Sequence, residues 1–332
     1  MLSCEIDHDS RGKMKHIKPI SLKGIKTYSV KERPNKISVK DFGSSWKAGG
    51  TFEMWFQGLP TILAASDLRR VIARLTDAVR ERKTIILAMG AHVIKVGLSP
   101  VMLDLMERGI ITAIAMNGAG IIHDVEVAMV GATSEDVDND LHTGRFGMAK
   151  ETGEFLNRAI KEGAEKGEGL GYSVGKSILE ESFPYKSYSI LAEAARMNIP
   201  TTVHVAIGTD IIHFHPAVDG AAIGKATHLD FRIFARLVSQ LEGGAYINLG
   251  SAVVLPEVFL KAFTLVKNLG FTLKNFTTVD MDFIRHYRPT TNVVKRPTLE
   301  GGEGFSLTGH HELMFPLLAA ALIENIENTR NE

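Results

Sequence analysis

Short apolar runs alternate with amphipathic helical segments along most of this chain. The run at 84–89, TIILAM, is continuous and rich in β-branched residues, which is typical of a strand buried on both faces of a parallel sheet. Similar runs predict four more strands, at 112–116, 201–205, 246–249 and 276–279. This alternation constrains the fold more than any other feature of the sequence.

Apolar residues at helical spacing predict helices between these strands. In the first helix, Leu68, Val71 and Leu75 share one face behind a Ser66 cap. The other predicted helices cover 99–109, 123–130, 151–161, 190–197, 231–241, 256–268 and a segment starting near 312. Strands and helices that alternate in this way form βαβ units. We therefore predict an α/β fold with a single Rossmann-like, doubly wound, mostly parallel sheet and helices on both faces.

The beginning of the chain lacks this periodicity and is rich in Lys and Arg. We therefore predict a basic N-terminal arm at residues 1–44, followed by one domain at residues 45–330. The arm is either solvated or packed on a neighbouring subunit. The polar, glycine-rich stretch between Gly131 and Gly175 is interpreted as an excursion within the domain, because the same alternation continues after it.

The overall charge excludes some classes of partner. Lys+Arg and Asp+Glu both number 38, so no global field favours nucleic acid or an anionic membrane. The longest apolar run, near 313–323, is shorter than the ~20 residues of a membrane span, and no signal peptide is evident. The single cysteine, Cys4, fits a reducing compartment. We expect a cytoplasmic protein that binds neither nucleic acid nor membrane.

In a doubly wound sheet, ligands bind beyond the carboxyl ends of the strands. Small or polar residues follow the predicted strands at 90–92, 117–120, 208–210 and 250–252, and Asp280 follows the last. The segment NGAG at 117–120 resembles half of a phosphate-binding turn, although His123 stands where the dinucleotide fingerprint has its third glycine. A tight turn between a strand and a helix explains the same residues equally well.

Histidines cluster in HVAIGTDIIHFHP and again before the last helix. On an extended segment His213 and His215 would face the same side, where Asp210 or Asp219 could complete a metal site. The spacing matches no zinc motif such as H-E-x-x-H, which favours a pocket lining without metal. A metal-dependent hydrolase or lyase is the alternative, and its ligands would be His204, His213, His215 and His310.

Two further kinds of chemistry find little support in the sequence. The acidic run at 136–140 lacks the glycine and the final glutamate of a calcium loop. No G-x-S-x-G motif is present, and Cys4 lies in the arm. Lys295 precedes the last helix on a segment predicted to be irregular, where it could form an imine, although a solvated surface lysine is the simpler explanation.

Residues 84–126, TIILAMGAHVIKVGLSPVMLDLMERGIITAIAMNGAGIIHDVE, resemble a block of the deoxyhypusine synthases and their bacterial relatives. ILAEAARMNIPTTVHVAIGTD, YINLGSAV and ELMFPLLAAALI are similar to later segments of that family, in the same order. The resemblance implies a homo-oligomer, usually a tetramer, with NAD bound at subunit interfaces. In that family NAD takes hydride from a carbon beside an amine of spermidine, and the imine passes to an enzyme lysine.

By position, the resemblance implies that one set of residues contacts NAD. The set comprises Ala91, His92, Val93, Ile94, Lys95, Asn117, Gly118, Ala119, Asp210, Ser251, Thr278, Val279, His310 and His311. Within it, Asp210 is expected to hold a ribose hydroxyl, as acids after such strands do.

The sequence departs from the family at positions that matter for the substrate. His123 replaces an acid ahead of Asp124, His215 replaces another acid, and the family's tryptophan-glycine-lysine segment is absent. Because imidazoles do not neutralise a polyamine cation, we predict a small amine or hydroxyl substrate other than spermidine. His123 or His215 would be the general base and Lys295 an optional imine-former, with Asp124, His213 and Asp219 in substrate binding. A non-catalytic nucleotide-binding relative is a third hypothesis.

Overall fold

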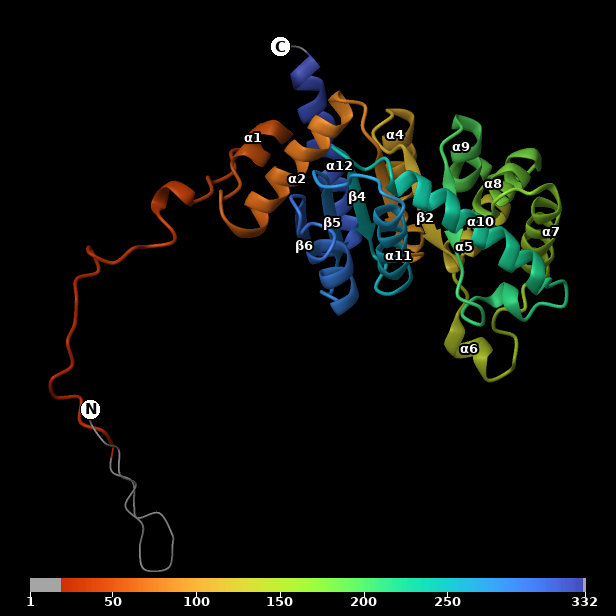
Figure 1. Ribbon diagram of the computed structural model, residues 1–332, viewed down its shortest axis with the longest axis horizontal. Coiled ribbons are helices and arrows are strands. Elements are labelled where there is room, and N and C mark those ends of the chain that lie inside the picture. The colour runs from red at the N-terminus through yellow and green to blue at the C-terminus, as the bar shows by residue number, and fades with distance from the viewer. Residues whose placement is uncertain (1–18, 331–332) are drawn as a thin grey trace, which may run out of the picture. The chain divides into compact units, whose positions relative to one another are not determined.

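The computed structural model describes residues 19–330 (Figure 1). Cys4 and the first part of the predicted arm lie outside this range. The chain divides between Asp41 and Phe42 into two units. The described part of the first unit is exposed and contains one short 3-10 helix, η1 (Val39–Asp41). The second unit carries the sheet and all the α-helices of the described residues.

The second unit is built on a six-stranded, entirely parallel sheet in the order β3-β2-β1-β4-β5-β6. The strands are β1 (Ile85–Met89), β2 (Ala113–Asn117), β3 (Thr201–His204), β4 (Ala245–Leu249), β5 (Thr277–Asp282) and β6 (Glu303–Thr308). The chain reverses its direction of travel across the sheet between β1 and β4, where Ile85 pairs with Ala245. This order is that of a doubly wound dinucleotide-binding sheet, so the predicted fold class is confirmed.

Twelve α-helices and several short helical turns connect these strands within the described residues. The longer helices are α2 (Leu63–Arg80), α4 (Ser99–Glu107), α5 (Gly118–Val130), α7 (Lys150–Lys166), α8 (Leu170–Glu180), α9 (Ile190–Met197), α10 (Gly220–Val238), α11 (Val254–Asn268) and α12 (His311–Arg330). The shorter elements are α1 (Phe52–Gln57), α3 (His92–Lys95), α6 (Val137–Leu141), η2 (Lys186–Tyr188), η3 (Ile211–His213) and the π-helix η4 (Pro289–Lys295). Between residues 19 and 330, no helix is both long enough and apolar enough to cross a bilayer.

Helices cover both faces of the sheet, as predicted. Alternate residues of β1 enter two separate apolar clusters: Leu87 packs with α2, α4, α5, α9 and α12, whereas Ile86 packs with α10 and α11. In the second cluster Tyr246 of β4 stacks on Phe259 of α11 with 3.8 Å between ring centroids. The buried residues of α7 and α8 belong to the first cluster, and Figure 1 shows both helices at the end of the sheet beside α9 and α10. The two clusters fix α5 and the loop after β3 at the carboxyl edge of the sheet.

Several elements differ from the sequence expectation. β6, α8 and the short helices α1, α3 and α6 were not predicted, α5 begins at Gly118 instead of 123, and α10 begins at Gly220 instead of 231. Glycines weaken the helical pattern in α8, but its close packing requires them. A Cβ at Gly171 would lie 2.5 Å from the carbonyl oxygen of Thr201, and one at Gly175 would lie 2.4 Å from that of Leu191.

Candidate functional site

A cavity of about 190 Å³ lies at the carboxyl edge of β1, β2 and β3. Lys95 from α3, His123 and Glu126 from α5, and Asp210 from the loop after β3 are among the residues that line it. We call it the edge cavity. It brings together four of the residues predicted for catalysis or cofactor binding, from segments far apart in the sequence: Lys95, Ala119, His123 and Asp210.

The start of α5 forms one wall of the edge cavity. Asn117 ends β2 and caps the helix, because its Oδ1 accepts a hydrogen bond from the N–H of Gly120 at 3.1 Å. The N–H groups of Gly118 and Ala119 have no acceptor within the helix. A Cβ at Gly118 would lie 2.1 Å from Oδ2 of Asp210, so this close approach of carboxylate and backbone requires glycine. The predicted small-residue turn therefore positions Asp210.

A chain of hydrogen bonds determines which ring nitrogen of His123 carries the proton. The Thr133 hydroxyl donates its proton to Oε2 of Glu126 at 2.5 Å, and the Thr152 hydroxyl donates to Oε1 at 3.2 Å. Nδ1 of His123 lies 2.7 Å from Oγ1 of Thr133. Since the only Thr133 proton is given to Glu126, its oxygen accepts from Nδ1–H of His123. Nε2 of His123 therefore carries no proton and has a free lone pair, as a general base requires.

Burial controls the charge of this group. Burial and, to a smaller extent, the nearby Lys95 ammonium together lower the pKa of His123 to about 4. Burial also raises the pKa of Glu126, while hydrogen bonds from Thr133 and Thr152 oppose that change. The pKa of Asp210 is raised by burial as well. At neutral pH, His123 is therefore a neutral imidazole.

Asp124 does not face the edge cavity. Its Oδ1 accepts from the N–H of Ile190 at 2.8 Å, and its Oδ2 accepts from the N–H of Leu191 at 3.1 Å and from the Ser189 hydroxyl at 2.5 Å. The side chain is 1% exposed, and burial raises its pKa to about 6. Both oxygens hold the start of α9, so the predicted substrate contact of Asp124 is wrong.

Two of the predicted pocket residues after β3 hold their own loop. Nδ1 of His213 accepts from the N–H groups of Gly208 and Asp210, at 3.1 and 3.3 Å. Oδ1 of Asp219 accepts from the first N–H groups of α10 at 3.0 Å. His213 belongs to η3 and not to an extended segment, so the period-two argument for this pair of histidines fails.

His215 is buried away from the edge cavity. It packs so tightly on α7 that a Cβ at Gly153 would lie 2.2 Å from its ring, and its Nδ1 accepts from the N–H of Ala217 at 3.2 Å. It does not line the edge cavity. The prediction of His215 as a general base is therefore wrong, and His123 is left as the candidate base.

Lys295 lies at the other edge of the sheet. It ends η4, and the carbonyl oxygen of its neighbour Val294 would lie 2.1 Å from a Cβ at Gly304. Gly304 is the second residue of β6, so this contact lies at the amino edge. The segment predicted to be irregular is a π-helix followed by a strand. The prediction of Lys295 as an imine-forming residue in this site is wrong.

The other residues assigned to NAD fall into two groups. The side chains of Val93, Ile94 and Val279 are buried in the apolar core, which excludes ligand contact through these side chains. Thr278 is buried as well, but its hydroxyl oxygen has no hydrogen-bond partner. The hydroxyl of Ser251, also buried, accepts from the N–H of Leu255 at 3.2 Å and so caps α11. The second group, Ala91, His92, His310 and His311, lies where β1, β4 and β6 end.

His311 is the most unusual member of that second group. It is 1% exposed at the start of α12, and a Cβ at Gly250 would lie 2.7 Å from its Cε1. Its ring lies 5.3 Å from that of His92, and burial lowers its pKa. Neither ring nitrogen has a hydrogen-bond partner, although Nε2 lies 3.6 Å from Oδ1 of Asp282. Unsatisfied buried polar atoms are rare in folded proteins, and a ligand, a water molecule or an ion can supply the missing partner.

The structure does not bring together the four histidines of the metal alternative. Among residues 19–330, no group of three or more His, Cys, Asp or Glu side chains is arranged to hold a metal ion. His204 instead contacts Thr202 at 3.0 Å and the edge of Phe234, while His310 stacks on Phe283 at 6.2 Å. The four histidines proposed as ligands therefore serve separate local contacts.

Sequence reasoning missed Glu126, Thr133 and Thr152. The spacing of His123 and Glu126, three residues apart on one helix, could have identified Glu126 as a neighbour. The two threonines come from the loop after α5 and from α7. No pattern in the sequence connects these segments.

Comparison with protein-family models finds no match, and a search of curated proteins finds none either. Among solved structures, the chain is similar to a conserved protein from Methanococcus maripaludis S2 assigned to the LOR/SDH group. Identity is 18%, over 78% of this chain and 70% of that one, with a TM-score of 0.48. It is also similar to a protein from Entamoeba histolytica assigned as a deoxyhypusine synthase, at 15% identity over 85% and 96% of the chains, with a TM-score of 0.49.

A third similarity is to ArgZ, a cyanobacterial arginine dihydrolase, at 17% identity and a TM-score of 0.48. It covers 78% of this chain but 31% of that one, so this chain spans about a third of that enzyme's length. Similarity at these levels leaves the chemistry to be inferred from the side chains of this chain.

Proposed function

We propose that this protein is an NAD-dependent enzyme of the deoxyhypusine synthase type that oxidises a small amine or alcohol in the edge cavity. The observation that supports this most is the hydrogen-bond chain from Glu126 through Thr133 to His123. It presents a neutral imidazole with a free Nε2 in a cavity at the carboxyl edge of a doubly wound sheet.

Three features of the chain fit NAD. The carboxylate of Asp210 follows β3, where an acid can accept from ribose hydroxyls. The N–H groups that begin α5, at Gly118 and Ala119, suit an anionic group. The ring nitrogens of His311 are buried and unpartnered between the ends of β4 and β6. NAD in this place would supply the hydride acceptor.

The residues of the edge cavity would handle the proton. Nε2 of His123 takes a proton from the nitrogen or oxygen of the substrate, and Glu126 stabilises the resulting imidazolium through Thr133. Lys95 opposes protonation of His123 before substrate binds, because both would carry positive charge. With Lys295 at the opposite edge, we propose direct oxidation without a covalent step through that residue.

The experiment has a binding part and a turnover part. We expect NADH at millimolar concentration to raise the melting temperature, because a ligand that binds only the folded chain stabilises it. A set of small amines and alcohols is then screened for formation of NADH. His123→Gln should keep NADH binding and reduce turnover about 10²- to 10⁴-fold. His228→Gln, on the exposed surface of α10, is the control.

The outcomes separate the hypotheses. If neither NAD⁺ nor NADH changes the melting temperature, the proposal is wrong. If NADH binds and His123→Gln leaves turnover unchanged, His123 is not the base. If NADH binds and no substrate in the screen is oxidised, the non-catalytic alternative is favoured.

We also propose that the protein is a homo-oligomer, with the tetramer expected from the resemblance. Apolar side chains that follow four of the strands are exposed, and a neighbouring subunit would cover such side chains. They are Ile207, Val253, Ile284 and Leu313, exposed by between 48% and 68%. Light scattering on the purified protein tests this, and a monomeric mass would contradict it.

A further inference from the structure

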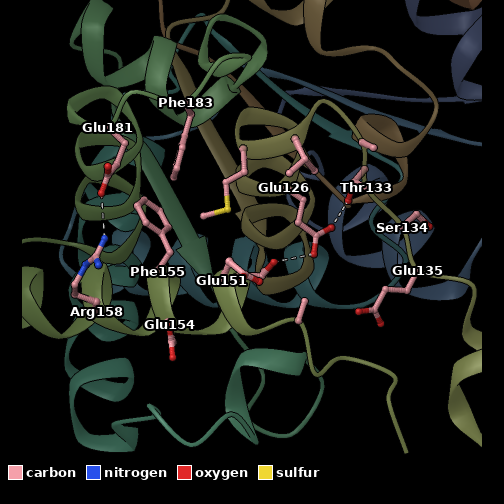
Figure 2. Close-up of a pocket in the computed structure, with 15 residues that line it drawn as sticks. Glu126, Thr133, Ser134, Glu135, Glu151, Glu154, Phe155, Arg158, Glu181 and Phe183 are labelled. Atoms are coloured by element: carbon pink, nitrogen blue, oxygen red, sulfur yellow. Dashed lines mark hydrogen bonds and ion pairs between the residues drawn. The ribbon is translucent and has the colours of Figure 1, made fainter. Parts of the chain in front are cut away.

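A second cavity, of about 750 Å³, lies between α5, α7 and the segment after α8 (Figure 2). Five glutamates and one arginine line it, so we call it the acidic cavity. The arginine, Arg158, is engaged: it forms an ion pair with Glu181 at 3.1 Å and lies over the ring of Phe155. Glu151 and Glu154 have no basic partner within residues 19–330. The cavity therefore has an excess of negative charge.

The acidic cavity is apolar as well as charged. Phe155 and Phe183 meet edge to face with 5.3 Å between centroids, and Met129 lies in the same lining. In Figure 2 these rings and the Arg158–Glu181 pair lie on one side, whereas Glu126 and Thr133 lie on the other. A volume of this size is in the range of pockets that hold small organic ligands. Its lining suits an aliphatic chain that carries a cation.

The two cavities are adjacent. Glu126, Ser134 and Glu135 belong to the lining of both. Ser134 at this boundary has a φ of +76°, a conformation that residues other than glycine rarely adopt. Strained backbone of this kind is concentrated at ligand sites. The boundary between the two cavities is therefore formed by Glu126 of α5 and by the loop residues Ser134 and Glu135. Through Glu126, the hydrogen-bond chain that ends at His123 also borders the acidic cavity.

The edge cavity contains one basic side chain, Lys95, beside the carboxylates of Glu126, Glu135 and Asp210. Lys95 lies near His123, and its ammonium makes no ion pair or hydrogen bond with any residue from 19 to 330. Its ammonium is available to an anionic group. The edge cavity, at 190 Å³, has room for a small head group only. Because Lys95 is the one basic side chain that lines the edge cavity, it determines where the anionic group of a ligand that spans both cavities would lie.

We infer that the two cavities together bind an amino acid with a basic side chain. Its carboxylate contacts Lys95 in the edge cavity, its aliphatic chain passes Glu126 and Ser134, and its ammonium lies among the carboxylates of the acidic cavity. This inference rests on the proposed function, because the bound amino acid would be the substrate and the carbon beside its α-amine would lie near His123. Binding of the amino acid can nevertheless be measured without NAD.

The experiment uses the full chain, isothermal titration calorimetry and three matched probes. L-lysine carries both charged ends, cadaverine lacks the carboxylate, and L-norleucine lacks the side-chain amine. We expect L-lysine to bind at least about tenfold more tightly than either analogue, since each loses one charge-assisted contact. Equal or tighter binding of cadaverine or of L-norleucine would overturn the inference.

Charge-neutral variants assign each end. Lys95→Gln should weaken L-lysine about tenfold and leave cadaverine unchanged. The double variant Glu151→Gln/Glu154→Gln should weaken L-lysine and cadaverine and leave L-norleucine unchanged. Glu162→Gln/Glu165→Gln is the matched control, because both residues lie exposed on α7 outside either cavity. Variants that weaken all three probes equally, or none, contradict the assignment. Binding of NADH, measured separately, reports on the proposed function.

Discussion

Two carboxylates lie two residues apart on α5 and serve different purposes. Asp124 accepts two backbone N–H groups and a serine hydroxyl at the start of α9, without exposure to solvent. Glu126 accepts two threonine hydroxyls beside two cavities. The comparison teaches that the donors distinguish the roles: backbone donors make a buried acid part of the fold, while side-chain donors orient it towards a ligand.

The largest effect should come from removing the structural carboxylate. Asp124→Ala leaves the N–H groups of Ile190 and Leu191 and the Ser189 hydroxyl without their acceptor in a buried place. We expect the free energy of unfolding to fall by about 4 kcal/mol. Urea denaturation measures it. Glu126→Gln is the comparison and should cost less than about 1 kcal/mol, and equal losses would remove the distinction between the two acids.

A pH dependence of stability should come next in size. Burial raises the pKa of Asp230 to about 7, although the N–H groups of Gly171 and Val203 donate to it. Since its ordinary pKa is 3.8, the folded chain holds this proton more firmly than the unfolded chain. The contribution of Asp230 to stability is then largest at low pH and falls as the pH rises from about 4 through about 7, by on the order of 4 kcal/mol.

Urea midpoints across this pH range test Asp230 directly. Asp230→Asn cannot ionise, so its stability should change less with pH than that of the wild type. Identical pH profiles for the two proteins would show that Asp230 does not hold a proton in the folded state. The pH dependence of stability would then have to come from other groups.

The smallest effect should come from breaking the hydrogen bond by which Thr133 links His123 to Glu126, the acid that faces the cavities. Thr133→Val keeps the shape of the side chain but breaks the link between Glu126 and His123. We expect turnover of the substrate to fall about tenfold, because the imidazole loses its fixed tautomer, while the urea midpoint changes little. A loss of stability as large as that of Asp124→Ala would show that Thr133 and Glu126, like Asp124, serve mainly to stabilise the fold.

The sequence supports correct prediction of the fold class because buried parallel strands have a strong local pattern. It also points to the edge of the sheet where the edge cavity lies, since the residues after β1, β2 and β3 supply Lys95, His123 and Asp210. It fails for Asp124 because neighbouring residues on a helix point about 100° apart, and which of them meets the cavity depends on how α5 packs. That packing is tertiary information.

The errors at Lys295 and His215 have a related cause. η4 and β6 carry weak local signals, so the chain could not be followed from one edge of the sheet to the other. The place of His215 depends on Gly153, which belongs to a helix some sixty positions earlier in the sequence. Contacts between distant segments decide which polar residues reach a ligand.

The pairing of β1 with β4 also determines when the protein can fold. Ile85 meets Ala245 only after most of the chain has been synthesised, and until then the β4 side of β1 is an unpaired apolar strand. Non-local parallel pairings of this kind form slowly and expose strand edges meanwhile. We therefore expect nascent chains that end before β4 to aggregate. Pairing with β4, which is synthesised late, is what covers the edge of β1, the first strand of the chain.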